Sequence, residues 1–239
     1  MVALQGRVFD RYRQYQKLAP EVQTQVTAIA ESVLTSKLFT KESVGLLRSV
    51  VGVSSDRLVD AVAKHLSVEK PEAASLVDGL VLSGALSLYG EKNAELAAKL
   101  DKFAGAGVVF VPTDAKLAQR GDETSVWSVR DGAIQAGVLK RPSKSFFGAK
   151  DAYVVANETR KTLFIFDADY AEELSHKLDL ADSSVQFDDS IEHGVKVTNA
   201  VDSVIVGTPS KEMQNEWLNS IINAGATYRE AFNTNLEAV

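Results

Sequence analysis

The chain has 239 residues, enough for one large domain or two small ones, and its 45% hydrophobic and 24% charged residues are an ordinary globular composition. It contains no cysteine, which excludes a disulfide framework and a thiolate metal site and fits a reducing, cytoplasmic location. The residues from Trp127 onward hold the whole net charge of −6, with 17 Asp and Glu against 11 Lys and Arg, so neither half has the basic excess that nucleic-acid binding demands and no nucleic-acid partner is expected.

The first half of the chain is predicted to be mostly helical. Residues 8–18 predict a short helix or an arm, and Pro20 opens a helix whose apolar residues recur on one face. Residues 54–56 offer a cap to the next helix. Pro71 suits the first position of a third helix, which ends before Gly84.

Short strands and a linker follow these helices. Residues 86–89 alternate as in a half-buried strand, and residues 91–100 show a short helical pattern. Residues 108–111 predict a strand that ends at Pro112. The polar stretch 114–125 is the best linker, and we place the domain boundary there.

Two helices followed by a short strand are typical of a winged helix. The run of residues 58–88 resembles the second half of a DEP domain, where an Ala-x-x-Leu…Leu-x-x-Gly-x-Ile string closes a small helical core beside a wing. Residues 38–47 stand where the family has a tryptophan-containing helix, although without the tryptophan. The resemblance implies a DEP-like domain over residues 20–113, a module that contacts membranes or proteins.

After the linker, the hydrophobic pattern changes from the helical period to the alternation of strands. Turn residues lie at 141–143, 157–159 and 188–190. Regularly spaced short strands of this kind are typical of a barrel or a sandwich. The strand candidates are residues 133–140, 152–156, 162–166, 176–180, 194–198 and 203–206.

The last predicted element is an amphipathic helix that begins at Pro209 and Ser210. We expect it to cover the mouth of a barrel and to bury Trp217, a side chain whose truncation costs about 3–5 kcal/mol. In the alternative, the apolar stripe of this helix binds a partner helix. The stripe consists of Met213, Trp217, Ile221, Tyr228 and Phe232, widened by Leu218 and Ile222.

This second half resembles a pleckstrin-homology (PH) domain. Residues 137–142 are similar to the Gly-x-Leu-x-Lys opening strand of the family, and residues 150–155 and 162–166 match the next two strands. Trp217 occupies the position of the tryptophan in the family's terminal helix. The resemblance implies an antiparallel β-barrel capped by a C-terminal α-helix over residues 127–233, and hence an α+β chain. A DEP-like module followed by a PH-like module resembles the C-terminal portion of pleckstrin-type signalling proteins.

The PH resemblance also implies a lipid site. The family's phosphoinositide signature is a lysine that ends the first strand, followed by Lys/Arg-x-Arg on the second strand. Lys140 and Lys150 match it, but Ala152 replaces the final arginine, the side chain best suited to bidentate phosphate contact. The next hairpin adds two cations and is expected to open at the same end of the barrel. The predicted lipid-binding residues are Lys140, Arg141, Lys144, Lys150, Arg160 and Lys161.

Lipid contact through these residues is expected to be weak and peripheral. No stretch approaches the roughly 20 apolar residues of a membrane-spanning helix. Six cations near an anionic leaflet contribute at most about 6 kcal/mol, whereas micromolar affinity needs about 8 kcal/mol. Phe146 and Phe147 in the same loop could add apolar insertion. In the alternative, the lysines only solvate the loop and the two phenylalanines pack beneath it.

The sequence lacks the usual patterns for catalysis, cofactors and metals. It has no Gly-x-Ser-x-Gly elbow and no Walker-type loop, and residues 105–110 lack the third glycine of a dinucleotide fingerprint. His65 is expected at the surface, and the acidic residues near His176 and His193 lack the spacing of a calcium loop. We therefore expect no catalytic residues, no cofactor and no metal.

Two hypotheses follow for a cytoplasmic, non-enzymatic chain with a protein partner. In the first, the chain is a signalling or scaffold adaptor, and its PH-like domain contacts a phosphoinositide or an acidic membrane lipid weakly at the membrane periphery. In the second, it is a protein-interaction or cytoskeletal assembly component whose PH-like domain binds protein and not lipid.

Overall fold

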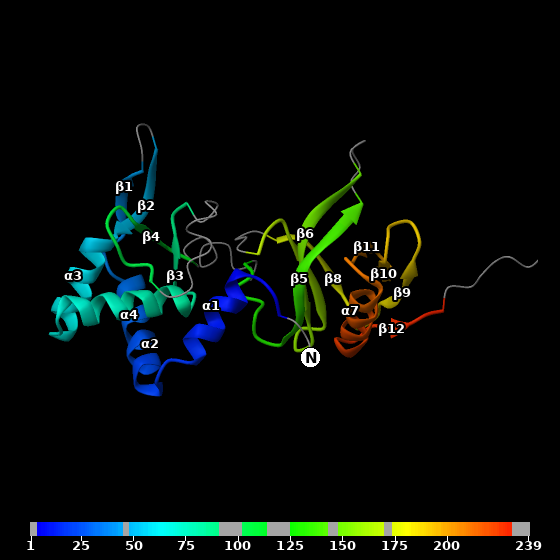
Figure 1. Cartoon of the computed structure of the whole chain (residues 1–239), viewed down its shortest axis with the longest axis horizontal. Coiled ribbons are helices and arrows are strands. Elements are labelled where there is room, and N and C mark those ends of the chain that lie inside the picture. Colours follow the sequence, from blue (N-terminus) through cyan, green and yellow to red (C-terminus); the bar gives the residue numbers. More distant parts are fainter. Residues whose placement is uncertain are drawn as a thin grey trace, which may run out of the picture. The chain divides into compact units, whose positions relative to one another are not determined.

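The computed structural model describes residues 4–44, 48–90, 102–113, 125–142, 148–169 and 174–230. The chain forms two compact units. The helical unit is Arg7–Asp122, and the strand-rich unit combines Met1–Gly6 with Glu123–Val239. The predicted α+β class is confirmed, since helices with a small sheet are followed by a large, mainly antiparallel sheet and a helix (Figure 1). No helix among the described residues is long and apolar enough to cross a membrane.

The described part of the helical unit contains the predicted helices, and most of the stretch 8–18, predicted as a short helix or an arm, lies in a helix that ends at Gln16. The pattern at 91–100 and most of the predicted linker lie outside the described residues. The elements are α1 (Arg7–Gln16), α2 (Pro20–Leu34), β1 (Thr40–Ser43), β2 (Ser49–Ser54), α3 (Ser55–Leu66), α4 (Lys70–Leu82), β3 (Leu86–Leu88) and β4 (Val109–Pro112).

The core of the helical unit lies between α2, α3, α4 and the small sheet. Leu58 of α3, Val77 of α4 and Phe110 of β4 are fully buried in it. Helices α2 and α4 approach closely at Gly79, where an added Cβ would lie 2.6 Å from the Val26 side chain. The apolar stripes read from the sequence therefore pack against one another, as their helical spacing predicts.

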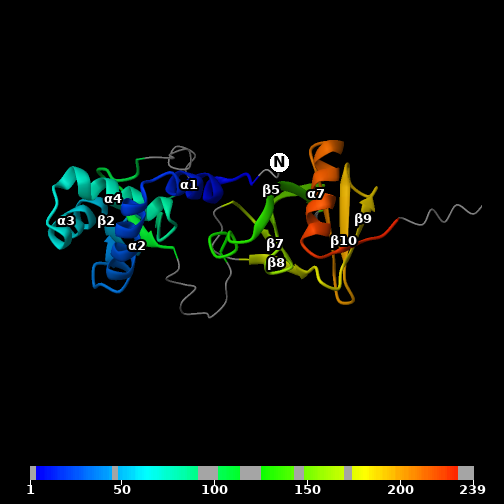
Figure 2. The same ribbon diagram turned by 90° about the horizontal axis from the view of Figure 1, so that it is seen from below.

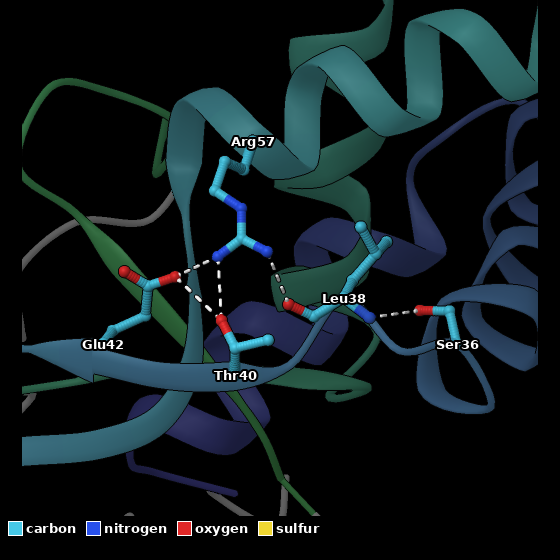
Figure 3. A network of polar contacts seen from close by, with 5 residues as sticks. All are labelled: Ser36, Leu38, Thr40, Glu42 and Arg57. Carbon is cyan, nitrogen blue, oxygen red and sulfur yellow. Dashed lines mark hydrogen bonds and ion pairs between the residues drawn. The ribbon is translucent and has the colours of Figure 1, made fainter.

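Strand β1 occupies residues for which the DEP resemblance implies a helix. It pairs antiparallel with β2, at the edge of a sheet of order β1-β2-β4-β3. Arg57, in the first turn of α3, donates to Thr40 Oγ1 (2.9 Å) and to the Leu38 carbonyl (3.3 Å), and it pairs with Glu42 (Figure 3). These bonds tie β1 to α3, and the polar sequence of β1 has no apolar stripe that a helix would bury.

The strand-rich unit contains all six predicted strands and two that the sequence pattern did not predict, β9 and β12. Its sheet has the order β12-β9-β10-β11-β5-β6-β7-β8, and all neighbours are antiparallel except β12, which is parallel to β9. The elements are β5 (Ala133–Pro142), β6 (Ala149–Asn157), β7 (Thr162–Phe166), β8 (Leu174–Asp179), β9 (Ser184–Asp188), β10 (Gly194–Thr198), β11 (Ser203–Gly207), α7 (Lys211–Asn223) and β12 (Thr227–Tyr228).

Helix α7 covers the sheet and buries the predicted tryptophan. It packs on β5, β9 and β10, and Trp217 is fully buried against residues such as Leu139 and Val154 (Figure 1). The helix ends at Asn223, because the chain passes through Gly225 with a φ of +125°, a conformation that favours glycine. Tyr228 therefore lies on β12 and not on the helix, which corrects the predicted stripe, and Phe232 lies outside the described residues.

Among the described residues, no strand pairing closes the predicted barrel. Strands β8 and β9 follow one another in the chain but are not neighbours in the sheet as described. The turn between them is held by Asp179, whose Oδ1 accepts the Ala181 N–H (2.9 Å), and the Leu180 N–H donates to the Lys161 carbonyl (2.7 Å). The described strands therefore form one sheet that runs from β12 to β8, with α7 packed over its core (Figure 2).

Candidate interaction site at the β5–β6 hairpin

The register of β5 on β6 decides which predicted cations share a face. Lys140 is the cross-strand partner of Asp151, and Arg141 is the partner of Lys150. Partners across a sheet point to the same side, and neighbours along a strand point to opposite sides. Arg141 and Lys150 therefore share one face, whereas Lys140 lies on the other. The two lysines of the predicted signature do not converge.

Each of the two lysines has a carboxylate beside it. Lys140 Nζ lies 2.6 Å from Asp151 Oδ1, and Lys150 Nζ lies 3.7 Å from Asp167 Oδ1. The four side chains are between 57% and 75% exposed, so each pair contributes at most about 1 kcal/mol to stability. Together with Arg141, the described residues at this end provide three cations and two carboxylates. Each carboxylate offsets the positive charge of the lysine beside it.

The position that replaces the signature arginine faces the core. Ala152 is 2% exposed and is paired with Leu139, which is also buried. An arginine at this position would start from an apolar, buried face, where an unpaired charge is costly. Alanine fits the packing, and no other described side chain of β6 supplies the missing guanidinium. Lys144, Phe146 and Phe147 lie outside the described residues.

Arg160 and Lys161 lie at the opposite end of β6 from Lys150. They belong to the turn between β6 and β7, whereas Lys150 follows the turn between β5 and β6. Successive antiparallel hairpins open at opposite ends, because each strand reverses the chain direction. The expectation that both loops open at the same end was wrong. The five of the six predicted residues that the structure describes therefore do not form one surface.

Arg160 is bonded to the main chain of its own unit. Its guanidinium donates to the Ser128 carbonyl (2.7 Å), and its backbone N–H donates to Asn157 Oδ1 (2.8 Å). Asn157 is fully buried, and its Nδ2 donates to the carbonyls of Val129 and Asp131, both at 2.8 Å. This network fixes the segment before β5 beneath the β6–β7 turn. An asparagine at the start of a turn was the sequence signal for it.

Lys161 completes this turn and stays exposed. Its φ is +48°, and its carbonyl accepts the Leu180 N–H (2.7 Å). Its backbone therefore has a structural role, while its ammonium group is the one predicted cation of this end that faces solvent.

The described residues were also searched for metal sites and cavities. No three His, Asp or Glu side chains there lie close enough together to hold a metal ion. His176 Nε2 lies 3.1 Å from Asp202 Oδ2, near enough for an ion pair but not aligned for a hydrogen bond. A cavity of about 190 Å³ in the helical unit is lined by Ile29, Ser32, Val33, Ser36, Leu38, Ala61, Val62 and His65.

Solved PH domains are similar in structure to about two fifths of the chain. A structure of the C-terminal PH domain of human pleckstrin has 17% identity and a TM-score of 0.36, covering 40% of this chain and 91% of that domain. A crystal structure of the pleckstrin domain in complex with D-myo-Ins(1,2,3,4,5)P5 has 17% identity and a TM-score of 0.35, covering 39% and 98%. The PH domain of human oxysterol-binding protein-related protein 11 has 17% identity and a TM-score of 0.34, covering 37% and 78%. No protein-family model and no curated protein matches the chain.

Proposed function

We propose that this chain is a non-enzymatic interaction module whose strand-rich unit binds a protein partner and not a phosphoinositide. The observation that carries the proposal is the hairpin end, where Asp151 and Asp167 stand beside the two signature lysines. Cations bind a phosphate through charge-assisted hydrogen bonds, and a neighbouring carboxylate competes for the same donors. Here the lysines lie on opposite faces, and Ala152 replaces the arginine.

Two further observations support protein over lipid. The guanidinium of Arg160 is engaged by the Ser128 carbonyl, which removes one predicted cation from any lipid surface. The residues from Trp127 onward have a net charge of −6, which opposes approach to an anionic leaflet. A weak contact with acidic lipid is the second candidate, and the common face of Arg141 and Lys150 favours it.

The non-enzymatic part of the proposal rests on the side chains available for chemistry. His65 is the single titratable side chain among the residues that line the described cavity, and it is exposed. Most acid–base sites pair such a group with a second acid or base, and no other lines this cavity. For the helical unit, we extend the proposal to a DEP-like role in protein contact, because α3, α4 and the antiparallel pair β3–β4 follow the helix, helix and strand order of a winged helix.

Vesicle sedimentation of the full chain tests the proposal. Phosphatidylcholine vesicles with and without phosphatidylinositol 4,5-bisphosphate are compared at low and at physiological salt, where surface charge is screened differently. We expect no sedimentation that depends on the phosphoinositide. The charge reversals Lys140→Glu and Lys150→Glu are each compared with the same single reversal at the exposed Lys177 on β8. Salt-dependent binding that only the Lys140 and Lys150 reversals abolish would contradict the proposal.

A further inference from the structure

Thr40 is an exposed threonine at the start of β1 in the helical unit. Strand β1 ends the order of its sheet, and its outer edge has no strand partner among the described residues. Figure 1 shows β1 and β2 as a hairpin that extends from the rest of this unit. An enzyme can therefore reach the Thr40 hydroxyl without opening the core.

Among the described residues, the guanidinium of Arg57 bonds only to the segment that contains Thr40. Its Nη1 donates to Thr40 Oγ1 (2.9 Å) and pairs with the carboxylate of Glu42, and its Nη2 donates to the Leu38 carbonyl (3.3 Å). Figure 3 shows the side chain reaching from α3 toward these three residues. These bonds hold the cation beside the threonine hydroxyl, and 46% of the arginine side chain remains exposed to solvent.

This guanidinium already binds an anion beside the hydroxyl. The Glu42 carboxylate shares Nη1 with Thr40, and its Oε1 lies 3.5 Å from Thr40 Oγ1. A phosphate on Oγ1 carries about −1.5 to −2 charges at pH 7 and three acceptor oxygens. It therefore competes with the single negative charge of Glu42 for the same donors.

The start of α3 also favours a negative charge at this place. Arg57 lies in the first turn of α3, at the positive end of the helix dipole. Ser54, at the N-cap of this helix, makes no side-chain bond to its first N–H groups. Lys41, which follows Thr40, is exposed and has no carboxylate partner among the described residues.

We propose that Thr40 is a phosphorylation site at which Arg57 binds the phosphate in place of the Glu42 carboxylate. A protein kinase transfers the γ-phosphoryl group of ATP to Oγ1. The Oγ1–P bond forms, the bond from the γ-phosphorus to the β–γ bridging oxygen breaks, ADP leaves, and the hydroxyl proton passes to the base of the kinase. The modification releases Glu42 and makes the surface of β1 more acidic. This inference goes beyond the proposed function, because it assigns a regulatory modification to the helical unit.

Urea unfolding of the full chain tests whether Arg57 binds the phosphate. Phosphothreonine is encoded at position 40 in the wild type and in Arg57→Gln, and each protein is compared with its unphosphorylated form. Charge-assisted hydrogen bonds are about twice as strong as neutral ones, so we expect the phosphate to raise the folded-to-unfolded ratio of the wild type by about five-fold. In Arg57→Gln it should lower the ratio, because Glu42 then repels the phosphate.

The matched control carries phosphothreonine at Thr24, an exposed residue of α2 whose hydroxyl donates to the Pro20 carbonyl (2.9 Å). The control phosphate should change the ratio equally with and without Arg57→Gln. An equal change at position 40 in both backgrounds would overturn the proposal. If Arg57→Gln does not fold, phosphorus NMR of the two phosphorylated wild-type chains decides. A nearby cation favours the dianion, so the pKa of the phosphate at position 40 should lie below that at position 24, and equal pKa values would overturn the site.

Mass spectrometry of the chain purified from its own cells, with phosphatases inhibited, tests whether the modification occurs. We expect peptides with phosphate on Thr40, and their absence would overturn the proposal. Phosphate on Ser36 or Ser43 in place of Thr40 would also overturn it, because Arg57 donates to neither hydroxyl. All of these residues belong to the helical unit, so a failure here leaves the vesicle result independent.

Discussion

The two ends of strand β6 hold basic residues in opposite roles. At its start, Lys150 is exposed and stands beside a carboxylate, as does Lys140 across the hairpin. At its end, Arg160 and Asn157 donate to main-chain carbonyls and hold a segment in place. The number of basic residues near the loops of this sheet therefore does not show whether the loops form a lipid-binding surface. Only cations without a carboxylate or a structural bond beside them contribute to one.

The largest expected effect is at the buried end. Asn157→Ala leaves the carbonyls of Val129 and Asp131 and the Arg160 N–H without their partner, so we expect the free energy of unfolding to fall by about 3 kcal/mol. The matched control is Asn199→Ala, since Asn199 accepts two N–H groups in an exposed turn, and it should cost about 1 kcal/mol. Urea unfolding measures the free energy of unfolding of both variants. Equal decreases would contradict the distinction between a buried and an exposed hydrogen-bond network.

A pair of glycines compares the two ends directly. Gly132 (φ +79°) precedes β5 at the buried end, and a Cβ there would lie 2.2 Å from Thr159 Oγ1. Gly148 (φ +81°) precedes β6, and a Cβ there would meet no atom within 4 Å. Both alanine variants carry the strain of a left-handed conformation, about 1 kcal/mol, and Gly132→Ala adds the clash, for a total of about 2 kcal/mol. Thermal unfolding should rank Gly132→Ala as the less stable variant, and the reverse order would contradict the packing described.

The neighbours Arg160 and Lys161 sharpen the comparison within one turn. Arg160→Ala removes the bond to the Ser128 carbonyl and should lower the free energy of unfolding by about 1.5 kcal/mol. Lys161→Ala removes only an exposed side chain and should change it by less than about 0.5 kcal/mol. Denaturant titration of the two variants tests the difference. A loss at Lys161 as large as that at Arg160 would mean that the guanidinium bond does not stabilise the turn.

The smallest expected effect is at the exposed end. Lys140→Ala and Lys150→Ala each remove one exposed ion pair, so each should change the free energy of unfolding by no more than about 0.5 kcal/mol. The same titration tests this expectation. A decrease above about 1.5 kcal/mol would show that these ion pairs stabilise the hairpin. The basic residues at the two ends of β6 would then both have a structural role.

Local pattern was enough to predict most helices and strands, and long-range contacts account for what was missed. Strand β9 was not predicted because only Val185 and Phe187 alternate there, between turn-like polar residues. Strand β12 and the parallel bridge of Leu4 to Ala136 exist only through partners far away in the sequence. The end of α7 could have been predicted, since Gly225 is a typical glycine just beyond a helix.

The sequence alone could have shown that the six predicted cations do not all lie at one end of the sheet. Chain reversal alone places the turn with Arg160 away from the turn before Lys150, whatever the details of the sheet. The pairing of Lys140 with Asp151 follows once the hairpin register is known, but the residue pattern alone does not say where the turn between the two strands lies and so does not fix that register. The bond from Arg160 to Ser128 depends on how the segment before β5 folds back.

The central claim is that Asp151 and Asp167 keep Lys140 and Lys150 from binding lipid phosphate. Removing the two carboxylates tests it most directly. The full chain with Asp151→Asn and Asp167→Asn is compared with the wild type by sedimentation with phosphatidylinositol 4,5-bisphosphate vesicles at low salt. Each lysine that loses its carboxylate contributes about 1 kcal/mol to binding at an anionic surface. We therefore expect the double variant to bind at least about ten-fold more tightly than the wild type. A wild type that binds as tightly as the double variant would contradict the claim.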